Sequence, residues 1–352
     1  MKTITSEKVS RLARYQEKLP DNAVRCHLCP HNCTIHEGKQ GICQTRVNHQ
    51  GELYTIAYGN PCSVSVDPIE KKPLFHFLPG RDIFSIATAG CNFRCLNCQN
   101  WHISQSSPSM LNNYDLQPEE LVESALNQNI NNIAFTYTEP TVFYEYTFDT
   151  AKIAHEKGMK TVLISNGYIN QKPLIDLCPY LDAANIDLKC FDDAVYRQIT
   201  GGRLQPVLDT LKTLKEKGVW LEITNLLVPG YSDSPTMIQK MCDWLVENDF
   251  ADTPLHFSRF FPTYKLEQLA PTAENRLIEA KKIAEKSGMK FVYIGNIPGL
   301  RGENTFCPHC NQMLIERIGY IVKKNLIQNN LCPLCGNHIP GVWEETLSPE
   351  KA

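Results

Sequence analysis

The sequence predicts an α/β protein whose parallel strands form a partial or full (β/α) barrel. Seven short apolar runs alternate with longer amphipathic stretches, and near-continuous apolar strands are typical of a parallel sheet covered on both faces. Polar residues occur where the predicted strands end, which is where such barrels carry their functional groups. No Gly-x-Gly-x-x-Gly motif opens a helix after a strand, so a dinucleotide-binding sheet is disfavoured.

The alternation gives the expected elements in order. The predicted strands are Ile83–Ala87, Ile133–Tyr137, Thr161–Ile164, Ala184–Leu188, Trp220–Leu227, Leu255–Phe260 and Phe291–Ile294. The predicted helices between them include Pro118–Asn127, Val142–Lys157, Leu204–Lys217, Pro235–Glu247 and Ala273–Lys286. Pro118 suits a first helical turn, and Gly158, Gly218 and Gly288 stand where three of these helices should end.

Changes in composition divide the chain into three predicted units. Residues 1–80 form a cysteine-rich segment that wraps around the start of the barrel. Residues 81–300 form the barrel, and residues 301–352 form a small C-terminal module. Within the first unit, residues up to about Pro20 are expected to form a charged surface helix. Gly51–Pro79 is expected to form short strands and turns. With 352 residues, 42% of them hydrophobic, the chain can form one large core with appendages.

With a formal net charge of −3, the chain lacks the excess of basic residues that binds nucleic acid or an anionic membrane, so neither partner is expected. Residues 1–10 lack the apolar core of a signal peptide, and the expected compartment is the cytoplasm. Fifteen cysteines in a reducing compartment favour metal ligation over disulfides, and eleven of them fall in three groups. The remaining cysteines are expected to be buried apolar thiols: Cys62, Cys178, Cys190 and Cys242.

The central group, Cys91-x3-Cys95-x2-Cys98, lies on a tight loop after the first predicted barrel strand. Three thiolates cannot complete a tetrahedral zinc site, which takes four protein ligands. They can bind three irons of a [4Fe–4S] cluster and leave the fourth open to a small chelating ligand. An open iron suits chemistry rather than structural stabilisation. Three unrelated buried thiols are the alternative, since free cysteine is a common core residue.

The N-terminal group has the spacing Cys-x2-Cys-x3-Cys-x9-Cys and consists of Cys26, Cys29, Cys33 and Cys43. Gly38 and Gly41 allow the loop to fold back on a metal, so a second four-thiolate site, either zinc or iron–sulfur, is expected. Loop cysteines without a metal are the alternative reading.

The C-terminal group pairs two Cys-x2-Cys knuckles around a β-like stretch, Leu314–Tyr320. This pattern is typical of a zinc ribbon or rubredoxin-like module, with Cys307, Cys310, Cys332 and Cys335 at one tetrahedral centre. Metal binding there would supply folding free energy to a segment too small for its own core. The spacing leaves zinc and iron open.

The cysteine loop within a strand–helix repeat resembles the radical S-adenosylmethionine (SAM) superfamily from about Ile83 to Asn296. Segments that resemble its activating-enzyme branch, which installs glycyl radicals, are Ser165-Asn166-Gly167, Asp187-Leu188-Lys189, Thr200-Gly201-Gly202 and Val228–Asp233. A nearly full-length resemblance to the radical enzyme of the AmmeMemoRadiSam system adds Tyr58–Cys62, Gly90–Phe93, Cys98–Trp101, Tyr293–Asn296 and both terminal cysteine groups.

The resemblance implies that Cys91, Cys95 and Cys98 bind a [4Fe–4S] cluster and that SAM chelates its open iron. Reductive cleavage of SAM would give methionine and a 5′-deoxyadenosyl radical that abstracts hydrogen. Glu139 would accept hydrogen bonds from the cofactor ammonium, and Lys189 would neutralise its carboxylate. The further cofactor-binding residues implied are Ser165, Asn166, Asp187 and His256; a core histidine is the alternative for His256.

Four residues depart from the superfamily pattern. Tyr137-Thr138 stand where two glycines usually precede the acid. Asn97 stands where an aromatic residue usually precedes the third cysteine, and Ser165 replaces the usual acid of the activating enzymes.

The predicted function is a radical SAM oxidoreductase acting on an unknown small-molecule or protein substrate. The resemblance implies a flavodoxin or ferredoxin as reductant and Memo-like and AMMECR-like partners. A glycyl-radical activating enzyme is the first alternative, although that branch usually carries extra clusters in an insertion rather than at the ends of the chain. A metal-stabilised protein-binding module is the non-enzymatic alternative, and it leaves the polar residues at the strand ends unexplained.

Overall fold

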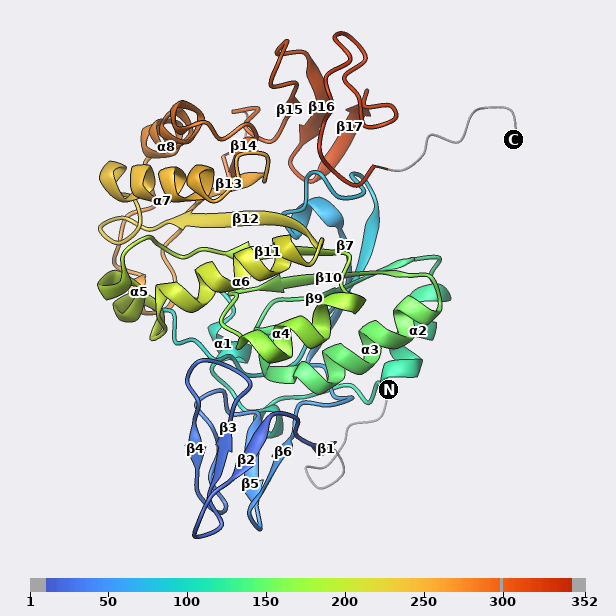
Figure 1. Ribbon diagram of the computed structural model, residues 1–352, viewed down its shortest axis with the longest axis vertical. Coiled ribbons are helices and arrows are strands. Elements are labelled where there is room, and N and C mark those ends of the chain that lie inside the picture. Colours follow the sequence, from blue (N-terminus) through green and yellow to red (C-terminus); the bar gives the residue numbers. More distant parts are fainter. Residues whose placement is uncertain (1–10, 298–299, 344–352) are drawn as a thin grey trace.

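The computed structural model describes residues 11–297 and 300–343, arranged around one eight-stranded sheet (Figure 1). The strand order is β14-β13-β12-β11-β10-β9-β8-β7, with β8 to β14 parallel and β7 antiparallel to β8. The strands are β7 (Ser63–Pro68), β8 (Asp82–Ala87), β9 (Asn132–Phe135), β10 (Lys160–Ser165), β11 (Ala183–Asp187), β12 (Trp220–Leu227), β13 (Leu255–Arg259) and β14 (Val292–Gly295). Within the described residues β7 and β14 are not paired, so the sheet is the partial form of the predicted barrel.

Helices connect the parallel strands and pack along the sheet (Figure 1). The α-helices are α1 (Trp101–Ser104), α2 (Pro118–Leu126), α3 (Tyr144–Glu156), α4 (Gln171–Leu177), α5 (Asp193–Thr200), α6 (Leu204–Glu216), α7 (Pro235–Glu247) and α8 (Glu274–Ser287). The short 3₁₀ helices are η1 (Ile69–Lys71), η2 (Pro108–Met110), η3 (Pro140–Phe143), η4 (Cys178–Tyr180) and η5 (Tyr264–Leu266).

Local sequence signals set several helix ends. Gln117 and Glu120 form a capping box at the start of α2, where Pro118 occupies the first turn. Asp192 caps α5 by accepting a hydrogen bond from the Val195 amide. The left-handed φ of +110° at Gly288 ends α8, as glycine at this position allows without strain.

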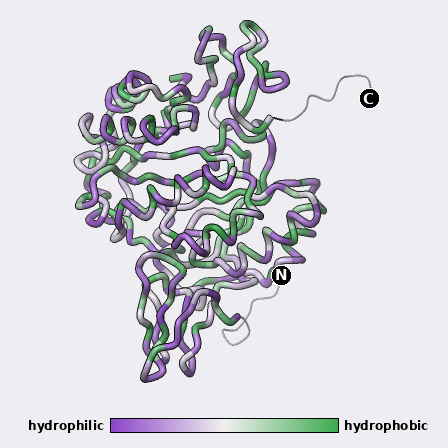
Figure 2. Tube along the Cα trace, viewed as in Figure 1, coloured by the Kyte–Doolittle hydropathy of each residue, from purple (hydrophilic) through white to green (hydrophobic). Residues whose placement is uncertain are grey.

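The core lies between the sheet and its helices. All four residues of β9 are buried, as are four of the five in β11, and most of these buried residues are apolar, as expected for strands covered on both faces. The outer helices alternate between hydrophilic and hydrophobic residues, so that each buries one face against the sheet (Figure 2).

The register brings the carboxyl ends of neighbouring strands to one edge. Ile86 of β8 is level with Phe135 of β9, and Ser165 of β10 is level with Ile186 of β11. The segments that follow these strands therefore meet at this edge, where the central cysteine loop begins.

The N-terminal segment forms two small antiparallel sheets. One has the order β1-β6-β5, with strands Arg11–Leu12, Glu52–Thr55 and Arg46–His49; the other has the order β2-β3-β4, with strands Gln16–Lys18, Val24–Cys26 and Thr34–Ile35. The predicted N-terminal helix is therefore wrong for residues 11–20, and residues 1–10 lie outside the described part. Pairing with distant strands overrides the helical appearance of this charged stretch.

The C-terminal module is a three-stranded sheet of β15 (Thr305–Phe306), β16 (Met313–Ile318) and β17 (Ile321–Asn325). Its buried residues form one cluster with Phe75 and Tyr293, so it packs directly on the barrel. Arg317 of β16 donates a hydrogen bond of 2.7 Å to the Phe75 carbonyl. In the described residues, no helix has the length and apolar character needed to cross a membrane.

Candidate functional site

The loop Cys91–Cys98 leaves the carboxyl end of β8 and is held from α5. The Arg94 amide donates a 2.7 Å hydrogen bond to the carbonyl of Thr200 at the end of this helix. The buried Phe93 ring packs on Gly202, where a Cβ atom would stand 2.3 Å from a ring carbon. The loop therefore depends on a segment more than a hundred residues later in the chain.

Protein donors surround the thiols of this loop. The Phe93 amide lies 3.3 Å from the Cys91 sulfur, and the Asn166 side-chain amide lies 3.8 Å from the same atom. The Cys98 sulfur lies 3.2 Å from the Ser104 hydroxyl. Donors to sulfur stabilise a thiolate and tune the potential of a cluster that it binds.

Burial raises the pKa of Cys91 well above its usual range, and burial raises that of Cys95 to about 12. Metal binding has to displace these protons, because the thiolate is the ligand. Within the described chain, Cys91, Cys95 and Cys98 do not form a compact group of the kind that could hold one metal ion, unlike the C-terminal thiols. Their spread suits a cluster that places each thiolate on a separate iron rather than a single ion.

Glu139 follows β9 and is buried beside this loop, close enough that its charge raises the pKa of Cys91. Its Oε1 accepts hydrogen bonds from the Thr141 amide and hydroxyl, at 3.0 and 2.7 Å, and from the Ser165 hydroxyl at 2.7 Å. Its Oε2 accepts one, from the Asn166 amide at 2.8 Å. Oε2 thus keeps acceptor capacity for a further donor such as an ammonium group.

Tyr137, two residues before Glu139, has a left-handed backbone with φ of +65°. A bulky residue rarely adopts this conformation, which glycine reaches without strain. The Tyr137 hydroxyl donates a 2.6 Å hydrogen bond to Asp67, and the Lys72 ammonium lies 4.6 Å from its ring centre. These contacts hold the tyrosine where the superfamily pattern has a glycine.

Asp187 and Lys189 follow β11 and form an ion pair of 2.7 Å. Burial opposes the charge of Lys189, but Asp187 and the sulfur of Cys95 outweigh burial and raise its pKa. The ammonium group therefore stays charged beside the cysteine loop. It can pair with a ligand carboxylate as well as with Asp187.

Asn225 of β12 lies beside this pair and was predicted as a polar residue at a strand end, but not as a cofactor-binding residue. Its side-chain amide donates a 2.6 Å hydrogen bond to the Leu188 carbonyl, between Asp187 and Lys189. Its Oδ1 is buried and has no hydrogen-bond partner. A buried acceptor without a partner at a strand end marks a place for a ligand donor. Its position at the end of a predicted strand was the available signal.

His256, near the amino end of β13, is placed in a different cluster. Its Nε2 lies 2.6 Å from Glu222 Oε2, and its ring packs on Phe75 and Tyr293. These neighbours lie under the C-terminal module. The structure thus brings together the other predicted cofactor-binding residues, but not His256, at the cysteine loop.

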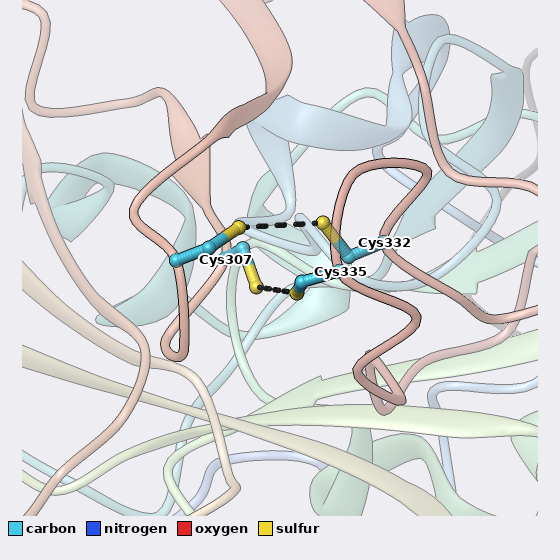
Figure 3. Close-up of side chains that lie close together, drawn as sticks. Cys307, Cys332 and Cys335 are labelled. Carbon is cyan, nitrogen blue, oxygen red and sulfur yellow. Dashed lines mark hydrogen bonds between the residues drawn. The ribbon is translucent and has the colours of Figure 1, made fainter.

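The four C-terminal thiols converge (Figure 3). The Cys307 and Cys335 sulfurs lie 3.6 Å apart, and those of Cys310 and Cys332 lie 3.7 Å apart. A tetrahedral zinc with bonds of 2.3 Å places its sulfurs about 3.8 Å apart, so this geometry fits one four-thiolate metal ion.

The N-terminal thiols line one recess instead of meeting at a point. Of the other cysteines, Cys178, Cys190 and Cys242 are buried as predicted, and Cys62 is only partly buried.

Comparisons with known proteins identify a family model that matches part of the chain, together with related proteins. Residues 85–245 match the model of the radical SAM superfamily. An uncharacterised protein of Methanocaldococcus jannaschii is 48% identical over 333 residues, covering 94% of this chain and 98% of that protein. The pyruvate formate-lyase 1-activating enzyme of Escherichia coli is 24% identical over 220 residues, covering 58% of this chain and 89% of that enzyme. The SuiB structure of Streptococcus suis has a TM-score of 0.48 at 15% identity, covering 65% and 51% of the two chains.

Proposed function

Because the chain belongs to the radical SAM superfamily, we propose that it reductively cleaves SAM and uses the resulting radical to abstract hydrogen from a substrate. Cys91, Cys95 and Cys98 hold the [4Fe–4S] cluster in this proposal. The observation that carries it is the gathering of these thiols with Glu139 and Lys189 at one edge of the sheet. When bound, the cluster and SAM supply one-electron cleavage of a carbon–sulfur bond and a 5′-deoxyadenosyl radical.

The residues of the chain bind and orient the cofactor. Oε2 of Glu139 accepts a hydrogen bond from the cofactor ammonium, and Lys189 pairs with its carboxylate. Asn225 offers its unpartnered oxygen to a donor of the cofactor or substrate. Ser165 and Asn166 hold Glu139 in position and thereby fix the direction of its free lone pairs.

The test is SAM cleavage by the anaerobically reconstituted full chain with dithionite. We expect 5′-deoxyadenosine from the wild type and none from Cys95→Ala, with the C-terminal metal retained in both. A reconstituted wild type that holds its cluster and releases no 5′-deoxyadenosine would contradict the proposal.

The finer assignment is to the AmmeMemoRadiSam system, with Memo-like and AMMECR-like partners and a flavodoxin or ferredoxin as reductant. Co-purification of the tagged chain with such proteins from its native cell tests this assignment. Similarity to activating enzymes supports a second candidate, installation of a glycyl radical. Deuterium transfer into 5′-deoxyadenosine separates the two: a labelled glycine in a partner protein supports the activase, and a labelled small molecule contradicts it.

A further inference from the structure

The thiols of Cys26, Cys29, Cys33 and Cys43 line a narrow recess in the N-terminal segment. The rest of its lining combines apolar side chains, such as Leu28 and Ile35, with the guanidinium of Arg46. The strand β3 supplies Cys26, and a turn closed by the Asn32 amide and the Cys29 carbonyl returns the chain to Cys33.

The spread of these sulfurs argues against a single ion. Among the residues that the structure describes, the four C-terminal thiols form a compact group that could hold one ion, with sulfurs all within 4.8 Å of one another, and the N-terminal thiols form no such group. The C-terminal arrangement matches one tetrahedral ion, so the N-terminal arrangement requires something wider between its ligands. A cluster of iron and sulfide fills such a space because its thiolates bind different irons.

Arg46 provides an independent observation, since its buried guanidinium lines the same recess. Its Nη2 pairs with Glu145 at 2.6 Å, and its Nη1 lies 3.9 Å from the Cys26 sulfur. Its Nε is buried and has no hydrogen-bond partner. A buried N–H group without an acceptor is costly, and a sulfur of a bound cluster would accept from it.

The recess shares a wall with the loop of Cys91. Asn92 lines the recess, and its carbonyl lies 2.8 Å from His31 Nε2, which lies on the same N-terminal loop. Gly90 abuts Cys43 so closely that a Cβ atom at Gly90 would stand 2.6 Å from the Cys43 carbonyl oxygen. The two groups of thiols are thus separated by a layer of only a few residues.

We propose that Cys26, Cys29, Cys33 and Cys43 bind a second iron–sulfur cluster, distinct from the one on Cys91, Cys95 and Cys98. The four thiolates are its ligands, and Arg46 donates a hydrogen bond to its sulfur and offsets its negative charge. This site depends on its own ligands, so it stands whether or not the chain cleaves SAM.

Acid-labile sulfide is the decisive measurement, since a mononuclear C-terminal ion carries none. The full chain with Cys91, Cys95 and Cys98 all replaced by alanine is reconstituted anaerobically with ferrous iron and sulfide. We expect about two or four sulfides per chain to remain, as for a [2Fe–2S] or [4Fe–4S] cluster, with an electron paramagnetic resonance signal after dithionite. A folded variant without labile sulfide overturns the proposal.

Adding Cys29→Ser and Cys33→Ser to this variant should remove the remaining sulfide. As the control, Cys178→Ser and Cys62→Ser are added to the triple-alanine variant instead. These thiols are not ligands, so the sulfide content should stay unchanged. If the triple variant fails to fold, the reconstituted wild type decides: about six or eight sulfides per chain support two clusters, and about four contradict them.

Discussion

Glu139 is the residue on which the proposed cofactor contact rests most directly. Hydrogen bonds from Thr141, Ser165 and Asn166 fix its carboxylate, although burial raises its pKa. Three of these four bonds fall on Oε1, and this asymmetry leaves Oε2 as the accessible acceptor. The side chain is therefore held in place before any ligand arrives.

Replacing Glu139 by glutamine should weaken SAM binding. The substitution exchanges a charge-assisted hydrogen bond, worth about 1.5–3 kcal/mol, for a neutral one worth about 0.5–1.5 kcal/mol, so the Kd should rise roughly tenfold. Isothermal titration of the reconstituted protein with SAM measures it. The exposed Glu119 supplies the control, because Glu119→Gln should leave the affinity unchanged. Equal affinities for wild type and Glu139→Gln would show that another group binds the ammonium.

At the scale of elements, the cysteine loop is supported by the end of α5 and the turn that follows it. Phe93 fills the space that Gly202 leaves, and the backbone of the loop bonds to Thr200. Movement of this turn would displace the cysteines without disturbing the sheet.

The substitution Gly202→Ala should lower cluster occupancy. Its Cβ would overlap the Phe93 ring, and overpacking of this kind costs about 1–3 kcal/mol. We expect less iron and labile sulfide on the Cys91 loop at unchanged circular dichroism. Gly295→Ala is the matched control, since a Cβ there meets its neighbour at an ordinary 3.7 Å. Full cluster content in Gly202→Ala would mean that the loop tolerates displacement of Phe93.

The sequence predicted the elements with the clearest patterns and missed those decided by tertiary contacts. The seven parallel strands were predicted because short apolar runs mark them, as Ile133–Phe135 marks β9. The helices α4 and α5 were not named among the predicted helices, because both are short and α4 contains Pro173. In the same way, cysteine spacing predicted the thiol groups, but not the contact between Cys43 and Gly90.

At the scale of the whole molecule, the C-terminal module is joined to the barrel through buried polar groups. His76 Nδ1 donates to the Pro340 carbonyl at 2.7 Å, and its Nε2 accepts from the Tyr293 hydroxyl at 2.6 Å. This arrangement requires the neutral imidazole, and burial lowers the pKa of His76 to about 4. Protonation would reverse the hydrogen bond to Tyr293, whose hydroxyl would then have to accept, and would place a positive charge in this buried site.

The free energy of unfolding should therefore depend on pH through His76. Its contribution is complete above the unfolded pKa of about 6.5 and is lost as the pH falls towards 4, by up to about 3 kcal/mol. Urea unfolding at a series of pH values measures this slope. His76→Gln should show a flatter dependence between pH 6.5 and 4, because the amide does not titrate. Parallel curves for the two proteins would assign the pH dependence to other groups.

Removal of a metal bound at the C-terminal cysteines should loosen the C-terminal module and weaken its packing on the barrel. Cys307 and Cys332 are buried in one cluster with Phe75 and Tyr293, so metal loss removes folding free energy from this interface. We expect a chelator to lower the melting temperature and to open residues 300–343 to proteolysis, with labile sulfide unchanged. Cys335→Ser should reproduce this result, and Cys62→Ser should not. Equal protease resistance with and without metal would show that packing alone holds the module.

The close approach of Gly90 to Cys43 also limits how this chain can be recombined with others. A partner barrel with any side chain at that position would meet the Cys43 carbonyl at 2.6 Å, and a left-handed φ of +92° adds strain. The N-terminal segment therefore cannot be exchanged freely between related barrels. It can be grafted without strain only onto a barrel that offers glycine at the first turn after β8.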